Sequence, residues 1–465
     1  MPEQVDLIVR NGTVVTSAGR QEADVAIRDG KFVAIGPRGE LDVKARETLN
    51  ASFNYVLPGV IDGHVHFREP GLEHEEDWES GSRAAVMGGV TTVLDMPNTN
   101  PPTRDAETAL AKKSLAEAKS HCDFGLIGLL AGDNVDQLRP MAEQGLVVGY
   151  KAFLGTTVGA IPAPDDGAVL DGMREIAALG LRLGFHAEND QIVANAIRKL
   201  QAAGRTDAMA HVESRPVLAE VESIQRMGLF ARETGCKVHI FHLSSGPGLE
   251  MIDEWRAKGV DYTCETGAHY CFLTSADMRE LGSLLRVNPP VREAGHGDAL
   301  LKGLADGRVT CIATDHAPHV PERKLNSDIW KAISGFAGVE TSVRLFLTFA
   351  VNTGRLTLEQ FVRASSEGPA QTWNLWPRKG SIRVGADADL TVVDLDQEGV
   401  IREGRMHGKN NLNPFEGSRT KGAPVATVVR GVIQMKDGKL TGQSGHGRLQ
   451  SPLVAAQAGS TVGRA

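Results

Sequence analysis

The 465-residue chain has few of the features that mark secreted or membrane proteins. It contains five cysteines, an odd number without a Cys-x-x-Cys pair, so we expect reduced thiols and not a disulfide framework. No apolar run approaches the length of about 18 residues that a membrane span needs. The N-terminal segment also lacks the apolar core of a signal peptide. We therefore expect a cytoplasmic protein with no membrane partner.

Positive charge is scarce as well, because 50 lysines and arginines stand against 58 aspartates and glutamates. Nucleic-acid-binding domains usually carry a basic surface, so a net charge of −8 argues against a nucleic-acid partner. The 41% of hydrophobic residues and 23% of charged residues are ordinary for a globular protein. Small anionic substrates remain compatible with this composition, since individual arginine and lysine side chains decide their binding.

Between residues 56 and 375, apolar strand-like runs alternate with helical stretches. Continuous apolar strands that alternate with helices are typical of a parallel sheet. After the run that leads to His64, we expect strands at 90–94, 123–130, 147–154, 182–186, 237–242, 261–266 and 309–314. Eight such units predict an α/β fold with a (β/α)8 TIM-type barrel over residues 56–379. An open doubly wound sheet is the alternative, but no early strand is followed by Gly-x-Gly-x-x-Gly.

Both ends of the chain carry short strand-like runs separated by turn signals. The pairs Asn11-Gly12, Asp29-Gly30 and Asp437-Gly438 each follow such a run and predict turns. The two β-rich ends predict one composite β-sandwich domain, residues 1–55 plus 380–444, with separate terminal hairpins as the alternative. The segment 445–465 is rich in small residues, and we expect a flexible tail or an arm.

Metal-competent side chains occur at the predicted strand ends. In His64-Val65-His66 the two histidines lie two apart on a strand, so both can point to the same face and bind one metal ion. Further polar residues that close or interrupt apolar strands are Lys151, His186, His242 and Asp315. Each has an ordinary structural explanation on its own, such as a helix cap for Asp315. Because barrel strands end at a common face where active sites lie, together they predict a metal centre.

Lys151 lies within an apolar run, where burial disfavours the ammonium form and lowers its pKa. A neutral amine can react with carbon dioxide to form an anionic carbamate, which can bridge two divalent cations. Imidazole and carboxylate ligands suit zinc, although they also accept manganese or cobalt. A hydroxide between two such ions is a nucleophile at neutral pH, and Asp315 is placed to take its proton.

The motifs around these residues resemble the cyclic-amide branch of the amidohydrolase superfamily, which holds dihydroorotase, allantoinase and hydantoinase/dihydropyrimidinase. The resemblance covers about residues 5–440 and rests on HVHFREPG, GYKAFLG, FHAEN, HLSS, ETGAHYCFLT, RVNPPVRE and ATDHAPH. It implies a homodimer or homotetramer with a binuclear metal centre. The implied ligands are His64, His66, carboxylated Lys151, His186, His242 and Asp315.

Arg68 bears on the choice of substrate, because a guanidinium beyond the second histidine can bind a carboxylate through two hydrogen bonds. Dihydroorotases place arginine there, and Asn98, Asn288 and His319 match further substrate-binding positions of that branch. The resemblance therefore implies a dihydroorotase of pyrimidine biosynthesis, which interconverts L-dihydroorotate and N-carbamoyl-L-aspartate. Without the resemblance, Arg68 could instead pair with Glu69 or Glu73, and Asn98 could be a turn residue.

Several features keep other functions open. The motif FHAEN looks closer to hydantoinases, and Lys151 stands where many dihydroorotases carry aspartate. Allantoinase, hydantoinase/dihydropyrimidinase or another cyclic amide or imide hydrolase is therefore the alternative. A non-catalytic scaffold is a more remote one, against which the retained ligand positions argue. The segment 323–326 is a candidate lid.

Overall fold

Eight parallel strands form the centre of the molecule in the computed structural model, which describes residues 4–155 and 161–453. They neighbour one another in sequence order: β6 (Val60–Val65), β7 (Val90–Asp95), β8 (Asp123–Leu129), β9 (Gly149–Phe153), β10 (Arg182–His186), β11 (Lys237–Ile240), β12 (Tyr262–Thr266) and β13 (Cys311–Ile312). A parallel bridge between Val65 and His316 brings the chain beyond β13 back beside β6. The predicted (β/α)8 barrel is therefore confirmed, and the open doubly wound sheet is wrong.

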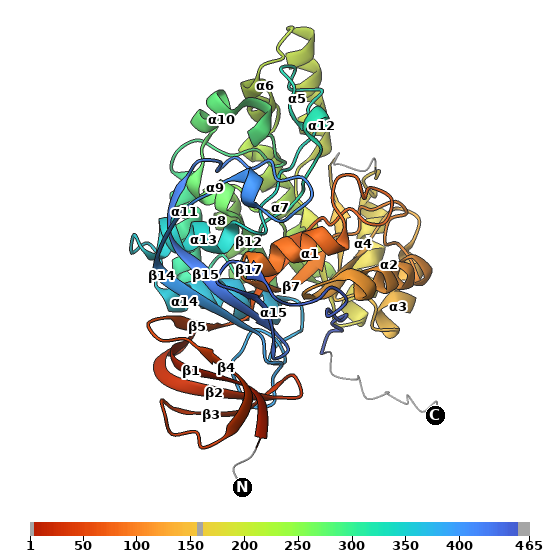
Figure 1. Ribbon diagram of the computed structural model, residues 1–465. Coiled ribbons are helices and arrows are strands. Elements are labelled where there is room, and N and C mark those ends of the chain that lie inside the picture. Colours follow the sequence, from red (N-terminus) through yellow and green to blue (C-terminus); the bar gives the residue numbers. More distant parts are fainter. Residues whose placement is uncertain (1–3, 156–160, 454–465) are drawn as a thin grey trace, which may run out of the picture.

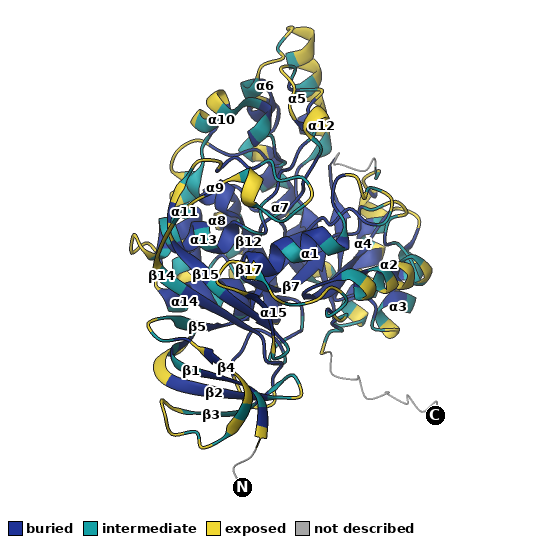
Figure 2. Ribbon diagram, viewed as in Figure 1, coloured by how far each residue is buried: buried dark blue, intermediate teal, exposed yellow. Residues whose placement is uncertain are grey.

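Helices alternate with the strands and surround the barrel (Figure 1). They are α1 (Trp78–Met87), α2 (Ala106–Lys119), α3 (Val135–Glu143), α4 (Asp166–Ala178), α5 (Asp190–Ala202), α6 (Ala208–Ser214), α7 (Val217–Thr234), α8 (Gly246–Ala257), α9 (Ala268–Phe272), α10 (Ser275–Leu281), α11 (His296–Asp306), α12 (Pro321–Lys324), α13 (Ser342–Phe346), α14 (Leu358–Val362) and α15 (Gly368–Thr372). Several begin at a side chain that accepts a hydrogen bond from the third helical N–H, such as Asp77, Asp105 and Asn189. Figure 2 shows that α5 and α12, at the top of the view, are largely exposed, whereas the barrel strands are buried.

The second sheet is built from both ends of the chain. Its strands are β1 (Gln4–Thr16), β2 (Gly19–Arg28), β3 (Lys31–Pro37), β4 (Lys44–Asn50), β5 (Tyr55–Pro58), β14 (Leu390–Val400), β15 (Arg419–Val429), β16 (Val432–Lys436) and β17 (Lys439–Leu440). Antiparallel pairing of β5 with β14 joins the two ends, and side chains such as Val25, Leu390 and Val428 form a separate core. The prediction of a composite β domain is confirmed, and separate terminal hairpins are wrong.

Two of the three predicted turns occur where expected. Asp29-Gly30 and Asp437-Gly438 connect antiparallel strands, and both residues of each pair have positive φ, as in a tight two-residue hairpin turn. The prediction for Asn11-Gly12 is wrong, because these residues lie inside β1. There the pairing with β2 shifts register between Val9 and Gly12, and Asn11 has a φ of 65°, so the Asn-Gly pair makes a bulge and not a turn.

A buried cluster of charges joins the second sheet to the barrel. Lys379 Nζ lies 2.7 Å from an oxygen of Asp389 and 3.0 Å from one of Asp387, and it also pairs with Asp123 at the start of β8. The chain beyond residue 444 packs beside this cluster, since Phe124 and Leu449 form a parallel bridge. Packed structure therefore continues through 445–453, whereas 454–465, the rest of the expected tail, lies outside the described residues.

Candidate active site at the barrel mouth

A pocket opens where the barrel strands end. Its lining comprises His66, Arg68, Asn98, Lys151, Phe153, His186, His242, Val287, Asn288, Asp315, Ala317, Ser334 and Gly335. Eight of the ten residues that the sequence predicts for the site are in this lining. The other two lie behind it, His64 against Lys151 and His319 against Arg68. Residues from eight separate parts of the chain thus meet at one face, as expected for a barrel.

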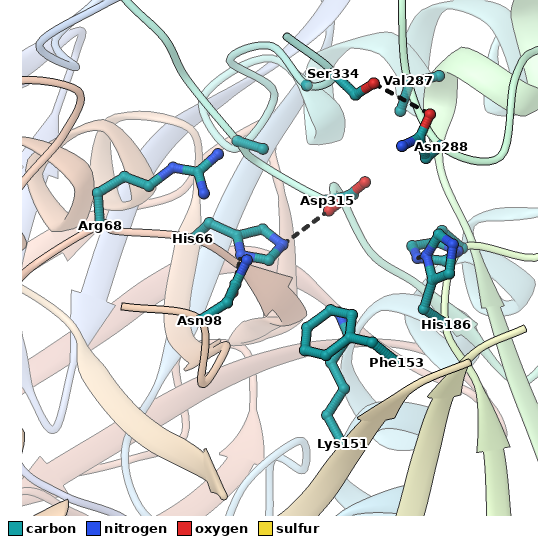
Figure 3. Close-up of a pocket in the computed structure, with 13 residues that line it drawn as sticks. His66, Arg68, Asn98, Lys151, Phe153, His186, Val287, Asn288, Asp315 and Ser334 are labelled. Atoms are coloured by element: carbon teal, nitrogen blue, oxygen red, sulfur yellow. Dashed lines mark hydrogen bonds and ion pairs between the residues drawn. The ribbon is translucent and has the colours of Figure 1, made fainter. Parts of the chain in front are cut away.

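The first group of candidate metal ligands comprises His64, His66 and Asp315. One ligand atom of each lies within 4.8 Å of the others. Asp315 Oδ1 is 3.1 Å from His66 Nε2 and 3.2 Å from His64 Nε2. Lys151 Nζ is 2.9 Å from the same nitrogen of His64. In Figure 3, Lys151 rises between His66 on one side and His186 on the other, with Asp315 opposite.

A second pair of candidate ligands faces this group. His186 closes β10 and His242 follows β11, and His186 Nδ1 lies 3.0 Å from His242 Nε2. The rings of His64 and His242 are 5.3 Å apart, so the two groups adjoin. Four imidazoles, a carboxylate and a lysine that converge in one buried place form a donor set suited to divalent cations such as zinc. The residues present therefore fit the predicted metal centre.

Oxygen atoms behind the imidazoles fix their orientation. His64 Nδ1 lies 2.5 Å from Glu265 Oε1, His66 Nδ1 lies 2.7 Å from Asn98 Oδ1, and His186 Nε2 lies 2.9 Å from Glu188 Oε2. An oxygen acceptor holds the proton on the nitrogen that it contacts, which leaves the lone pair of the other nitrogen facing the site. Asn98, predicted as a substrate contact, is thus bonded to His66. Glu265 was missed, although an acidic residue inside the apolar strand β12 signals such a role.

The ionisation of these groups follows from their burial. Burial, together with nearby positive charge, lowers the pKa of His64 and His66 well below 6.5, which favours the neutral imidazoles that bind metal ions. At Glu188 the effect of burial is outweighed by Arg215 and His186, which hold its pKa at about 2. Burial raises the pKa of Glu265 well above its usual range.

Lys151 is buried and has an unusual environment for a cation. Its Nζ lies 4.8 Å from the centre of the Phe153 ring and 4.5 Å from that of Phe241. Burial lowers its pKa to about 8, although Asp315 and Glu265 act in the opposite direction. An appreciable part of the amine is therefore neutral near physiological pH, as expected for a lysine within an apolar strand.

Three residues of the site have a backbone in the left-handed region, where side chains other than glycine are strained. Their φ values are 64° for Arg68, 40° for His242 and 50° for Asp315. Asp62 holds the segment that contains Asp315, because it accepts hydrogen bonds from Thr314 N at 3.1 Å and Thr314 Oγ1 at 2.5 Å. Such backbone strain persists where surrounding contacts over-determine the conformation, and it clusters at functional sites.

Arg68 is almost fully buried, and its guanidinium reaches the pocket. Its Nη2 lies 3.1 Å from His319 Nε2, and His319 Nδ1 in turn lies 3.3 Å from Glu75. Among the described residues, Arg68 Nε has no hydrogen-bond partner. Burial lowers the Arg68 pKa to about 10, so the side chain remains a cation. His319, predicted as a substrate contact, therefore stands behind Arg68 and supports it.

The predicted lid at 323–326 is anchored. Lys324 is buried and its Nζ donates to the carbonyl oxygens of Arg286 at 2.7 Å and Ile333 at 3.1 Å. Arg323 pairs with Glu75 beside His319. The short helix α12 is thus bound to the wall of the site, unlike a free loop.

Comparisons with known proteins agree with this architecture. The Amidohydrolase family model matches residues 55–434, and the chain belongs to that family. An L-hydantoinase of Paenarthrobacter aurescens is 37% identical over 95% of this chain and 97% of its own length. An allantoinase of Solibacter usitatus is 40% identical over 90% of this chain and 91% of its own length.

Solved structures give the same result. The L-hydantoinase (dihydropyrimidinase) from Arthrobacter aurescens superposes with a TM-score of 0.94 at 36% identity, over 96% of this chain and 100% of that one. A D-hydantoinase (dihydropyrimidinase) from Thermus sp. reaches a TM-score of 0.90 at 32% identity, over 96% and 99%. Among the described residues of this protein, no helix has the length and apolar character needed to cross a membrane.

Proposed function

We propose that this protein is a metal-dependent hydrolase of cyclic amides, of the hydantoinase and allantoinase type. The observation that carries the proposal is the convergence of four histidines, Lys151 and Asp315 at the mouth of the barrel. The allantoinase and hydantoinase names of its relatives support the same reaction class. They favour this alternative over the expected dihydroorotase of pyrimidine biosynthesis.

We assign two cations, which we take to be zinc, to this set of donor residues. His64, His66 and Asp315 would hold one, and His186 and His242 would hold the other. Lys151 would lie between them as a carbamate, formed when its neutral amine adds to carbon dioxide and loses a proton. Cations bound there would polarise the ring carbonyl and acidify a water molecule.

The protein's own residues then direct the proton. Asp315 lies at the pocket wall beside both His64 and His66. We assign it the role of general base toward the attacking water and of general acid toward the ring nitrogen. Water adds across one amide C–N bond, so the ring opens to a carboxylate while the nitrogen receives the proton from Asp315. With a hydantoin ring, the product is an N-carbamoyl amino acid.

Dihydroorotase remains a second candidate because of Arg68. A buried cation whose side chain lines the pocket, and whose Nε has no partner among the described residues, suits an anionic ring substituent. Asn98 contacts His66 through its side-chain oxygen, so its side-chain nitrogen is the atom that would donate to such a carboxylate. In the preferred reading, Arg68 contacts a ring carbonyl or a polar substituent of a hydantoin or of allantoin.

Steady-state hydrolysis by the zinc-loaded protein tests this proposal. Hydantoin, allantoin, dihydrouracil and L-dihydroorotate would be compared side by side, with Asp315→Asn as the inactive control. We expect the highest kcat/KM with hydantoin or allantoin. A preference for L-dihydroorotate would support the second candidate, and absence of hydrolysis with all four would contradict the proposal.

A further inference from the structure

A buried ion pair stands behind His186 and is not used by the proposed chemistry. Glu188 follows His186 by two residues on the loop before α5, and it is only 1% exposed. Its Oε2 contacts His186 Nε2 at 2.9 Å and also pairs with Arg215 Nη1. Burying two charges is costly, and a buried pair is often no more stabilising than apolar residues of similar volume. The stability of the fold alone therefore does not explain the Glu188–Arg215 pair.

The contact with Glu188 decides which nitrogen His186 offers to the site. The carboxylate accepts from Nε2, so the proton stays there and Nδ1 carries the lone pair. That Nδ1 is the atom that faces His242 Nε2 at 3.0 Å. His64, in the other group of candidate ligands, has its own carboxylate in Glu265. Each candidate metal position is thus supported by a different glutamate.

Arg215 extends this contact to the wall of the pocket. The Asn288 side chain lies in the pocket lining. Both its amide nitrogen and its amide oxygen find hydrogen-bond partners in the orientation in which the nitrogen donates to the Val287 carbonyl at 3.2 Å. In that orientation its oxygen accepts from Arg215 Nη2 at 3.3 Å. Arg292 holds Arg215 from the other side, by donating to the Arg215 carbonyl. The Arg215 guanidinium therefore contacts both Glu188, which is the partner of the candidate ligand His186, and Asn288, which is a candidate substrate contact.

We propose that Glu188 and Arg215 are positioning residues that link His186 to Asn288 in one buried unit. Through this unit, the second metal position and the substrate wall are ordered together. The inference rests on the proposed function, because it takes His186 to be a metal ligand. It adds two residues whose direct contacts differ: Glu188 contacts the candidate ligand His186, whereas Arg215 contacts Asn288 and reaches His186 only through Glu188.

Titration of the metal-free protein with zinc, against a competing chelator, tests the role of Glu188. We expect two equivalents in the wild type, and in Glu188→Gln one unchanged equivalent and one weakened by about 10- to 100-fold. Glu222→Gln is the matched control, because Glu222 accepts from Asn189 beside the same loop and contacts no imidazole nitrogen among the described residues. It should bind both equivalents as the wild type does.

The variant Arg215→Lys separates the two functions of Arg215. Lysine keeps a positive charge for Glu188 but lacks the second nitrogen that reaches Asn288. We expect both zinc equivalents to be retained, whereas KM for hydantoin rises several-fold with a smaller change in kcat. This variant also tests the inference if Glu188→Gln does not fold. An unchanged KM in Arg215→Lys would contradict the link to Asn288.

The outcomes also distinguish this inference from the proposed function. Wild-type protein that takes up no zinc would contradict the proposed function itself. Two zinc equivalents of equal affinity in the wild type and in folded Glu188→Gln would contradict only the role of Glu188. Weakening of both equivalents to the same extent would indicate general disorder of the site and would also overturn the assignment of Glu188 to one position.

Discussion

Lys151 and Lys379 are both buried lysines, yet their surroundings differ in kind. Lys379 is surrounded by the carboxylates of Asp123, Asp387 and Asp389, which raise its pKa although burial alone would lower it. Lys151 lies between aromatic rings and imidazoles, and burial lowers its pKa to about 8. The comparison shows that burial alone does not define the role of a lysine. A compensated charge holds two parts of the fold together, whereas an uncompensated amine is available for chemistry.

We expect the largest effect on kcat, from a change in the site that contains Lys151. Asp315→Asn removes the proposed general acid and base, and we expect kcat to fall by about 10²- to 10⁴-fold. Kinetics on the best of the four test substrates measures this loss. The unfolding free energy of the metal-free variant should stay near that of the wild type. A variant that keeps most of its activity would show that Asp315 has another role.

The Lys379→Met variant removes the cation that three buried carboxylates share, which leaves Asp387 paired with Lys31 and Asp123 paired with Arg430. Breaking a buried ion pair from one side costs about 3–5 kcal/mol, and we expect a loss of unfolding free energy of that size. Urea denaturation provides the measurement, and kcat/KM per folded molecule should not change. Lys302→Met is the control, because its pair with Asp306 is exposed to solvent and should contribute little to stability. Equal unfolding free energies of Lys379→Met and Lys302→Met would contradict the stabilising role of the Lys379 cluster.

The pH dependence of stability should differ in sign for the two lysines. Lys151 has a lowered pKa in the folded state, so between about pH 8 and 10.5 the unfolded chain binds more protons and stability rises with pH. Relative to Lys151→Met, the metal-free wild type should gain about 3 kcal/mol across this window, at about 1.36 kcal/mol per pKa unit. Lys379, with a raised pKa, should lose its contribution only above pH 10.5. If the difference in unfolding free energy between the wild type and Lys151→Met does not change with pH, the pKa of Lys151 is not lowered in the folded state.

The smallest effect concerns substrate choice. Arg68→Met removes one charged hydrogen-bond donor, worth about 1.5–3 kcal/mol, so KM should rise by about 10- to 100-fold for substrates with a polar or anionic substituent. Unsubstituted hydantoin should be affected less. Arg323→Met is a useful control, because Arg323 pairs with Glu75, which contacts His319 behind Arg68, and Arg323 is not part of the pocket lining. An equal loss on all substrates would mean that Arg68 serves the architecture and not recognition.

Much of this architecture could be predicted from local patterns. Apolar runs predicted the barrel strands, and the strand ends predicted where His64, His186, His242 and Asp315 lie. These predictions succeed because the two-residue period of a strand and the topology of the barrel strongly constrain where each residue at a strand end lies. Asn11-Gly12 was mispredicted because a bulge and a turn share the same residue preference, and only pairing with β2 separates them.

Contacts between side chains that are distant in sequence were harder to predict. The bond between Asn98 and His66, and the position of His319 behind Arg68, depend on the packing of separate loops. Glu265 lies 201 residues from His64, and no local pattern links them. The substrate prediction was affected in the same way, since Arg68 was interpreted without knowledge of what surrounds it.

The central proposal is that Lys151 would hold two cations together as a carbamate. Its most direct test is the number of zinc ions per chain after metal-free protein is reconstituted in the presence of bicarbonate. We predict two for the wild type and fewer than two for Lys151→Met, with both proteins folded. Two zinc ions in each would contradict the bridging role of Lys151, and none in the wild type would contradict the metal centre as a whole.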